Sequence, residues 1–326
     1  MRILFFSEKA GVHERRFLQK LASTAHDIFF LPVNATGSEP LPKGINVLPA
    51  LVPENHRADE ELIVAALRRH LADSTPDIVH AGPITTCAYW AARAGAQNLL
   101  AMSWGYDLLR ADLNHEQHER NRYALVHATT AACDCQTLAK QILTIAPNLD
   151  GKVFVFPWGV ELDRFYPGSS TLGLRKAHGW DNHTVVISTR SFERLYGFET
   201  MISAALLARQ GTCNLRFVFA GDGSLRPWAE KQIKAAGAEA EFAFLGWLSE
   251  DQVAAALRDA SVYMSGSTVD GTSISLLQAF ATRLPVVVSD LPANREWPRL
   301  CERPGPGHEL QCPPYRGRLE GGLPRV

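Results

Sequence analysis

The chain has 326 residues, of which 46% are hydrophobic and 21% charged, and its formal net charge is −1 at pH 7. This length predicts about two domains, each large enough for its own core, and the mixed charges give no indication of a polyanionic partner such as nucleic acid. The apolar run near the start, Ile3 to Phe6, is too short for a signal peptide, and no segment approaches the roughly eighteen apolar residues of a membrane span. We therefore expect a soluble, cytoplasmic protein.

Apolar runs alternate with helical segments in two series, as is typical of doubly wound parallel sheets. The first series has predicted strands at 3–6, 28–33, 45–48, 78–80, 99–103 and 153–156. The second series has them at 185–188, 217–220, 242–245, 262–264 and 286–288. Helices are predicted between strands, as at 15–22 and 60–71. The fold class is therefore α/β, with two Rossmann-like domains at residues 1–157 and 158–300.

Proline and glycine mark the joint and the end of the chain. The connector reads PWGVELDRFYP over residues 157–167. After Trp297 the composition changes abruptly, and Pro304-Gly305-Pro306-Gly307 excludes a continuous helix. We expect residues 301–326 to form a loosely packed Pro/Gly/Arg-rich tail, so that the C-terminal end of the second domain is truncated or atypical.

The sequence offers little that could bind a metal. His115 and His118 lack the spacing of a zinc-binding His-Glu-x-x-His helix and lie in a charged run, which favours a solvated surface. No Asp-x-Asp and no phosphate-binding Gly-x-x-x-x-Gly-Lys-Ser/Thr occurs. The six cysteines, at 87, 133, 135, 213, 301 and 312, show no disulfide framework and no Cys-x-x-Cys pair. For Cys133 and Cys135, ordinary half-buried thiols are favoured over a metal-binding or redox role. We predict no metal site and no cofactor.

The most informative segment runs from Ser265 to Glu296, where a polar turn lies between two predicted buried strands. Gly271, Thr272 and Ser273 open a predicted helix whose free amides and dipole favour an anion such as phosphate. Asp270 can accept hydrogen bonds from a polyol. It lies eight positions before Gln278, roughly two helical turns, so we expect both side chains to face one cleft.

This segment resembles the retaining glycosyltransferases of family four (glycosyl transferases group 1), which have the GT-B fold of two Rossmann-like domains facing a cleft. The resemblance rests on Asp270-Gly271, Gln278-Ala279, Leu284-Pro285-Val286-Val287 and Glu296. It implies that Asp270 contacts the donor sugar and that Gln278, where the family has Glu, contacts the ribose. The connector resembles the family's Pro-Asn-Gly-Val-Asp, with Trp158 in place of Asn.

The resemblance also implies a cationic grip on the donor's diphosphate. In the family an Arg is followed by a Lys-Gly; here Arg190 matches the Arg, and Tyr196-Gly197 stands at the Lys-Gly. Arg194 is a candidate for the missing charge, the alternative being a solvated surface arginine. The predicted clamp therefore consists of Arg190, the amides near Thr272 and Ser273, and Arg194.

Two glycine turns follow predicted strands of the second domain. Gly221-Asp222-Gly223 resembles a family turn in the nucleotide-binding half, and Phe244-Leu245-Gly246 resembles the turn that meets the base. Open α/β sheets bind ligands at such strand ends. In isolation the first turn is more often a tight connection than a nucleotide site, and the second is equally consistent with a glycine bend that ends a strand.

The first domain carries the predicted acceptor side. Gly11 and His13 lie where the family has its first glycine loop and helix. The resemblance assigns Gly11 to donor binding, and His13 is a candidate catalytic contact to phosphate or acceptor, or else merely exposed. His80 ends a predicted strand, and Ser103-Trp104-Gly105-Tyr106-Asp107 resembles the family's His-Gly-x-Asp, with Trp104 in place of the histidine. Trp104 and Asp107 are accordingly assigned to the acceptor side with His80.

The sequence thus predicts an enzyme that moves a sugar from a nucleotide-sugar donor to a hydroxyl acceptor, with retention and without metal. The acceptor class stays open among sugars, lipid-linked and small molecules, and peripheral membrane contact is compatible with it. The alternative is a glycosyltransferase-like binding or regulatory protein without turnover. It is favoured by Tyr196 for Lys, Gln278 for Glu and Trp104 for His.

Overall fold

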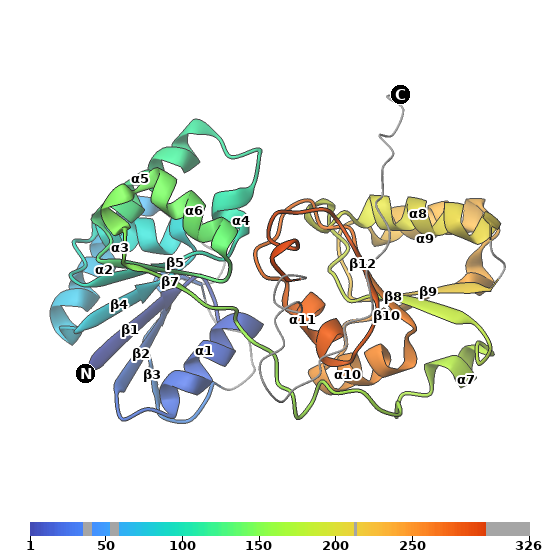
Figure 1. Cartoon of the computed structure of the whole chain (residues 1–326). Helices are drawn as coiled ribbons and strands as arrows, with labels where there is room; N and C mark the ends of the chain where they lie inside the picture. Colours follow the sequence, from blue (N-terminus) through green and yellow to red (C-terminus); the bar gives the residue numbers. More distant parts are fainter. Residues whose placement is uncertain (35–40, 53–58, 212–213, 298–326) are drawn as a thin grey trace, which may run out of the picture. The chain divides into compact units, whose positions relative to one another are not determined.

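The computed structural model describes residues 1–34, 41–52, 59–211 and 214–297, in two compact units, Met1–Trp158 and Gly159–Val326 (Figure 1). The division falls one residue beyond the end of the predicted first domain. The predicted tail at 301–326 lies outside the described residues. In the part of the chain that is described, no helix is long and apolar enough to cross a membrane.

The first unit contains a parallel sheet of seven strands in the order β3-β2-β1-β4-β5-β6-β7. The strands are β1 (Arg2–Ser7), β2 (Asp27–Pro32), β3 (Ile45–Val47), β4 (Ile78–Ala81), β5 (Leu99–Met102), β6 (Thr130–Cys133) and β7 (Val153–Val155). The sequence prediction missed β6 because its threonine, two alanines and cysteine give a weak strand signal. Cys133 and Cys135 are fully buried rather than half-buried, since the sheet is covered there.

The helices of this unit are α1 (Val12–Ala22), α2 (Glu60–Ser74), α3 (Tyr89–Arg93), α4 (Tyr106–Leu109), α5 (His115–His127) and α6 (Gln136–Ile145), with short turns η1 (Ile84–Ala88) and η2 (Pro147–Leu149). Figure 1 shows α1 on one face of the sheet and α3, α5 and α6 on the other. Side-chain caps fix two of the helix starts: Asp59 accepts from the amides of Glu61 and Leu62, and Asn114 and Gln117 form a reciprocal box.

The second unit has a five-stranded parallel sheet in the order β10-β9-β8-β11-β12. Its strands are β8 (Thr184–Ser188), β9 (Leu215–Ala220), β10 (Phe242–Gly246), β11 (Val262–Ser265) and β12 (Val286–Val288). Its helices are α7 (Leu174–His178), α8 (Phe198–Gly211), α9 (Arg226–Ala235), α10 (Glu250–Asp259) and α11 (Ile274–Ala281), with turns η3 (Arg194–Tyr196) and η4 (Glu239–Glu241).

The core of the second unit lies on both faces of its sheet. Val185 and Ile187 of β8 pack in a cluster with Leu276 of α11, whereas Phe217 and Phe219 of β9 pack in another with residues of α8 and α9. This two-sided burial explains the continuous apolar runs of the sequence. The expectation that β12 is covered on both faces is wrong for Val287, whose side chain is exposed because β12 is the last strand of the described sheet.

Each sheet reverses its strand order once, between β1 and β4 in the first unit and between β8 and β11 in the second. Beyond the carboxyl ends of the strands at such a reversal, the loops diverge and leave room for a ligand. A ligand site is therefore expected at each of these two points.

Candidate functional site

In the second unit a buried arginine bridges the loops that follow β8 and β11. Arg190 Nη2 lies 2.8 Å from Asp270 Oδ2, and Arg190 Nη1 donates to Ser273 Oγ at 2.8 Å and to Ser275 Oγ at 3.2 Å. Only 10% of the Arg190 side chain and 18% of the Asp270 side chain are exposed. The structure thus brings together two of the predicted catalytic residues.

Tyr196 covers the face of the same guanidinium. The Arg190 Cζ atom lies 4.1 Å from the centroid of the Tyr196 ring, a cation–π contact. Burial is the largest single influence and lowers the pKa of Arg190, but the Asp270 carboxylate, Tyr263 and Tyr196 together outweigh it, so the pKa is raised above its usual range. The cation is therefore permanent. We call Arg190, Tyr196, Asp270, Ser273 and Ser275 the Arg190 cluster.

Helix α11 begins beside this cluster. Ser273 is its N-cap and accepts from the amide of Leu276 at 3.4 Å, while Gly271 and Thr272 are buried in the preceding turn. Asp270 comes before the helix, so the predicted two-turn relation between Asp270 and Gln278 is wrong. Gln278 lies on α11 and is buried. The amide end of the helix is nonetheless next to Asp270, as the sequence predicted.

Two glycines hold the loops of the cluster against each other. A Cβ added at Gly197 would lie 1.9 Å from the carbonyl oxygen of Gly266, and Gly197 has φ +61°. Thr268 also donates its amide to Leu195 O at 3.0 Å. Because backbone meets backbone here, Tyr196 is held against Arg190 by main-chain contacts.

The predicted glycine turns pack against the same region. Gly221 donates its amide to Gly246 O at 2.8 Å, and a Cβ at Gly221 would meet the Arg190 carbonyl at 3.2 Å. A Cβ at Gly223 would meet Phe192 O at 2.6 Å. These glycines are thus required by close packing, whatever else they contact. Arg194 lies outside this packing, with 82% of its side chain exposed and Glu199 at 3.4 Å.

The acceptor-side residues of the first unit have different environments. Asp107 is buried and accepts hydrogen bonds from Ser103 Oγ at 2.7 Å and from the Ile84 amide at 2.8 Å, so it braces two loops. His80 is buried with Nε2 3.1 Å from Met102 Sδ, and burial lowers its pKa to about 4. Trp104 is half-buried, and the exposed His13 lies on α1, directly after its N-cap residue Gly11 and Val12, with its ring 5.4 Å from that of Trp104.

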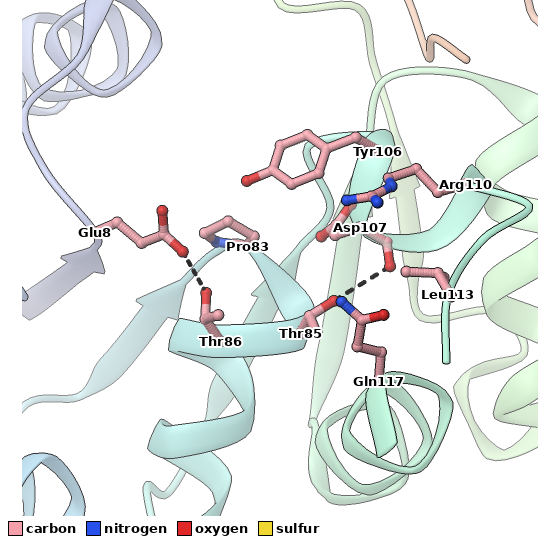
Figure 2. Close-up of a pocket in the computed structure, with 9 residues that line it drawn as sticks. All are labelled: Glu8, Pro83, Thr85, Thr86, Tyr106, Asp107, Arg110, Leu113 and Gln117. Atoms are coloured by element: carbon pink, nitrogen blue, oxygen red, sulfur yellow. Dashed lines mark hydrogen bonds between the residues drawn. The ribbon is translucent and has the colours of Figure 1, made fainter. Parts of the chain in front are cut away.

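A pocket of about 110 Å³ lies where the strand order of the first unit reverses (Figure 2). Thr86 Oγ1 donates to Glu8 Oε1 at 2.8 Å on one side. Figure 2 shows Glu8 at one end of the pocket and Arg110 and Gln117 at the other. We call it the hydroxyl pocket, and its lining is Glu8, Pro83, Thr85, Thr86, Tyr106, Asp107, Arg110, Leu113 and Gln117.

Of this lining the sequence prediction assigned a functional role to Asp107 alone. Glu8 follows β1 and Tyr106 follows β5 closely, so the strand-end rule that selected His80 would have found both. Arg110 and Gln117 carried no such signal, because a short helix and a loop separate them from the nearest strand.

Comparison with known proteins finds a separate family model for each of the two units. Residues 2–137 match the family model described as glycosyl transferase 4-like, and residues 173–298 match the model described as glycosyl transferases group 1. The chain belongs to the group 1 glycosyltransferases. Its fold is GT-B: the structure of Anabaena Alr3699/HepE in complex with UDP and glucose superposes with a TM-score of 0.73 at 16% identity, over 91% of this chain and 82% of that one.

Similarity to curated members of the family is partial. The chain is 25% identical over 149 residues to alpha-monoglucosyldiacylglycerol synthase of Acholeplasma laidlawii, covering 43% of this chain and 36% of that protein. It is 29% identical over 119 residues to alpha-D-kanosaminyltransferase of Streptomyces kanamyceticus, covering 36% and 31%. The chain spans less than half the length of the curated relatives that it matches.

Proposed function

We propose that the protein transfers a sugar from a nucleotide-sugar donor to a hydroxyl acceptor, with retention at the anomeric carbon. The observation that carries the proposal is the Arg190–Asp270 ion pair at the strand reversal of the second unit, beside the start of α11. A cation and helix amides suit a diphosphate, and a carboxylate suits the hydroxyls of a sugar. The family membership and the UDP and glucose named for the Anabaena protein support the same donor class.

The proposed reaction is a same-face substitution. The bond from the anomeric carbon to the diphosphate oxygen breaks, and the bond to the acceptor oxygen forms on the same side. Arg190 and the α11 amides stabilise the negative charge on the departing diphosphate. A diphosphate oxygen takes the acceptor proton, so the step needs no side-chain base. His80 fits this proposal, since its low pKa and burial make it a poor proton acceptor near neutral pH.

Metal independence is part of the proposal. The sequence has no Asp-x-Asp to bridge a cation to the diphosphate, and Arg190 supplies a permanent positive charge. The test is turnover in EDTA. Unchanged activity is expected, and a loss that magnesium or manganese restores would contradict the clamp.

The alternative is a binding or regulatory protein without turnover. One observation favours it: the guanidinium of Arg190 is held by Asp270 and two serines at its edge and covered by Tyr196 on its face. A diphosphate reaches this cation only if Tyr196 or Asp270 moves.

Two measurements on the full chain separate these functions. A thermal-shift screen with UDP-, GDP-, ADP- and TDP-sugars identifies the donor, since a ligand at a hundredfold excess over its Kd stabilises the native state by about 2.7 kcal/mol. Release of the nucleotide from the stabilising sugar is then followed over hours. Slow hydrolysis that Arg190→Ala abolishes supports the transferase, whereas stabilisation without any release supports the binding protein. No stabilisation by any of the four classes would reject both.

A further inference from the structure

Five aromatic rings gather on the first unit outside the hydroxyl pocket. Trp104 contacts Phe17, His13 and Trp158 at centroid distances of 6.0, 5.4 and 5.8 Å, and Trp158 contacts Phe17 and Phe156 at 5.1 Å each. Phe156 is 42% exposed and His13 is exposed, while the other three rings are half-buried. We call these five residues the aromatic patch.

The patch lies at the carboxyl edge of the sheet, where ligands bind. His13 and Phe17 belong to α1, which follows β1, and Trp104 follows β5. Phe156 and Trp158 follow β7, the edge strand of the sheet. From there the Trp158 ring contacts Phe17 of α1. Trp104 and Trp158, which follow different strands, contact each other there.

The patch borders the hydroxyl pocket. A Cβ at Gly82 would come within 3.3 Å of Trp104 Nε1, and the next residue, Pro83, lines the pocket. Tyr106 and Asp107 also line it, shortly after Trp104 in the chain. At about 110 Å³ the pocket is well below the roughly 300 Å³ of the smaller ligand pockets. It therefore holds only a fragment of a substrate, and the remainder lies on neighbouring surface.

The two surfaces differ in the chemistry that they bind. In the pocket the Glu8 carboxylate can accept hydrogen bonds at one end. At the other end the Gln117 side-chain amide and Arg110, whose Nε and Nη2 atoms already donate to Asp112, can donate them, which suits vicinal hydroxyls. The patch offers aromatic surface, which suits hydrocarbon. We propose that the first unit binds an amphipathic acceptor, with its hydroxyl-bearing head in the hydroxyl pocket and its apolar aglycone across the aromatic patch. This inference rests on the proposed function for its meaning, but the binding is measurable without donor.

The test is calorimetric titration of the full chain with methyl, hexyl and octyl β-D-glucoside, the hexyl and octyl compounds being kept below their critical micelle concentrations. Full burial of one methylene is worth about fourfold in affinity. Partial burial on the patch predicts that hexyl glucoside binds at least about tenfold more tightly than methyl glucoside. Equal affinity for the methyl and hexyl compounds, or no binding by any of them, would overturn the inference.

A matched pair of variants locates the effect. Phe156 and Phe154 are exposed phenylalanines two residues apart on either side of Val155, and only Phe156 belongs to the patch. Phe156→Ala, and more strongly Trp158→Ala, should reduce the gain from methyl to hexyl by at least about threefold, whereas Phe154→Ala should leave it unchanged. A gain that survives in Trp158→Ala and Phe156→Ala alike overturns the assignment.

Two controls keep the result decisive. Stabilisation by the donor found in the screen must persist in each variant, which shows that the chain folds and that the second unit is intact. Sedimentation of wild type and variants tests the rival occupant, a second copy of the chain: dissociation of a wild-type dimer by Trp158→Ala, without chain-length dependence, would replace the inference. If no nucleotide sugar stabilises the wild-type protein but its affinity for the glucosides still rises with alkyl length, the proposed function is rejected and this inference stands.

Discussion

The two units share one architecture, a parallel sheet whose strand order reverses once, yet they use the reversal differently. In the second unit it is filled by the Arg190 cluster, in which each terminal guanidinium nitrogen has a partner and the face is covered. In the first unit it contains the hydroxyl pocket, which is bordered by Trp104 of the aromatic patch. Topology therefore fixes where a ligand binds, while the side chains at the strand ends decide its chemistry.

The largest effect that tests this comparison is expected from Arg190→Ala. Breaking a buried ion pair leaves Asp270 without its cation, which costs about 3–5 kcal/mol in the free energy of unfolding. Affinity for the nucleoside diphosphate should fall at least about tenfold, and affinity for the nucleoside much less. Chemical denaturation and titration calorimetry measure the two quantities.

The control for Arg190→Ala is Arg194→Ala, which removes an exposed cation from the same loop. Its unfolding free energy should stay within about 0.5 kcal/mol of wild type. Equal losses of diphosphate affinity in both variants would mean that the buried cluster is not the main phosphate contact.

The backbone contact between Gly197 and Gly266 gives the next largest effect. Gly197→Ala places a methyl group against a carbonyl at a φ of +61°, and we expect a loss of about 2–4 kcal/mol in unfolding free energy. Gly179→Ala has a similar φ of +68° with nothing within 4 Å, so it should lose only about 1–2 kcal/mol. If denaturation finds the two variants alike, the contact adds nothing to the strain.

The first unit should be the more acid-sensitive through His80. Burial lowers the pKa of His80 from 6.5 to about 4. Between these two pH values the His80 side chain is therefore protonated in the unfolded chain and neutral in the folded chain. Stability is unaffected above pH 6.5 and falls below it, by about 2 kcal/mol on going from pH 7 to pH 5. His80→Leu should flatten the dependence of unfolding free energy on pH in this range. An unaltered dependence in that variant would assign the acid sensitivity elsewhere.

The smallest effect is expected where the second unit departs from its family. Tyr196→Lys replaces the ring over Arg190 by a second cation, and diphosphate affinity should rise about fivefold to tenfold. Tyr166→Lys is the matched control, because Tyr166 likewise covers an arginine, Arg258, at 5.0 Å. Calorimetry that shows the same gain in both variants would point to net charge alone.

The sequence predicted the topology better than the contacts. Apolar runs bounded by glycine and proline located eleven of the strands, since a parallel strand buried on both faces leaves a strong signal. It missed β6, whose small side chains fill a tight space without that signal. Arg190 and Asp270 were each selected, but not their ion pair, because pairing across a sheet depends on the strand order. The pocket around Glu8 and Arg110 depends likewise on segments that only folding brings together.

The contact between Phe17 and Trp158 joins an early helix to the last residue of the first unit. During synthesis, domains fold from the N-terminus as they leave the ribosome. Trp158 can therefore pack against Phe17 of α1 only after every strand of the first sheet has been synthesised. A fragment of the first unit that stops at Pro157, the boundary expected from sequence, would lack Trp158 and the three ring contacts that it makes. Expression of this unit by itself should extend through Trp158.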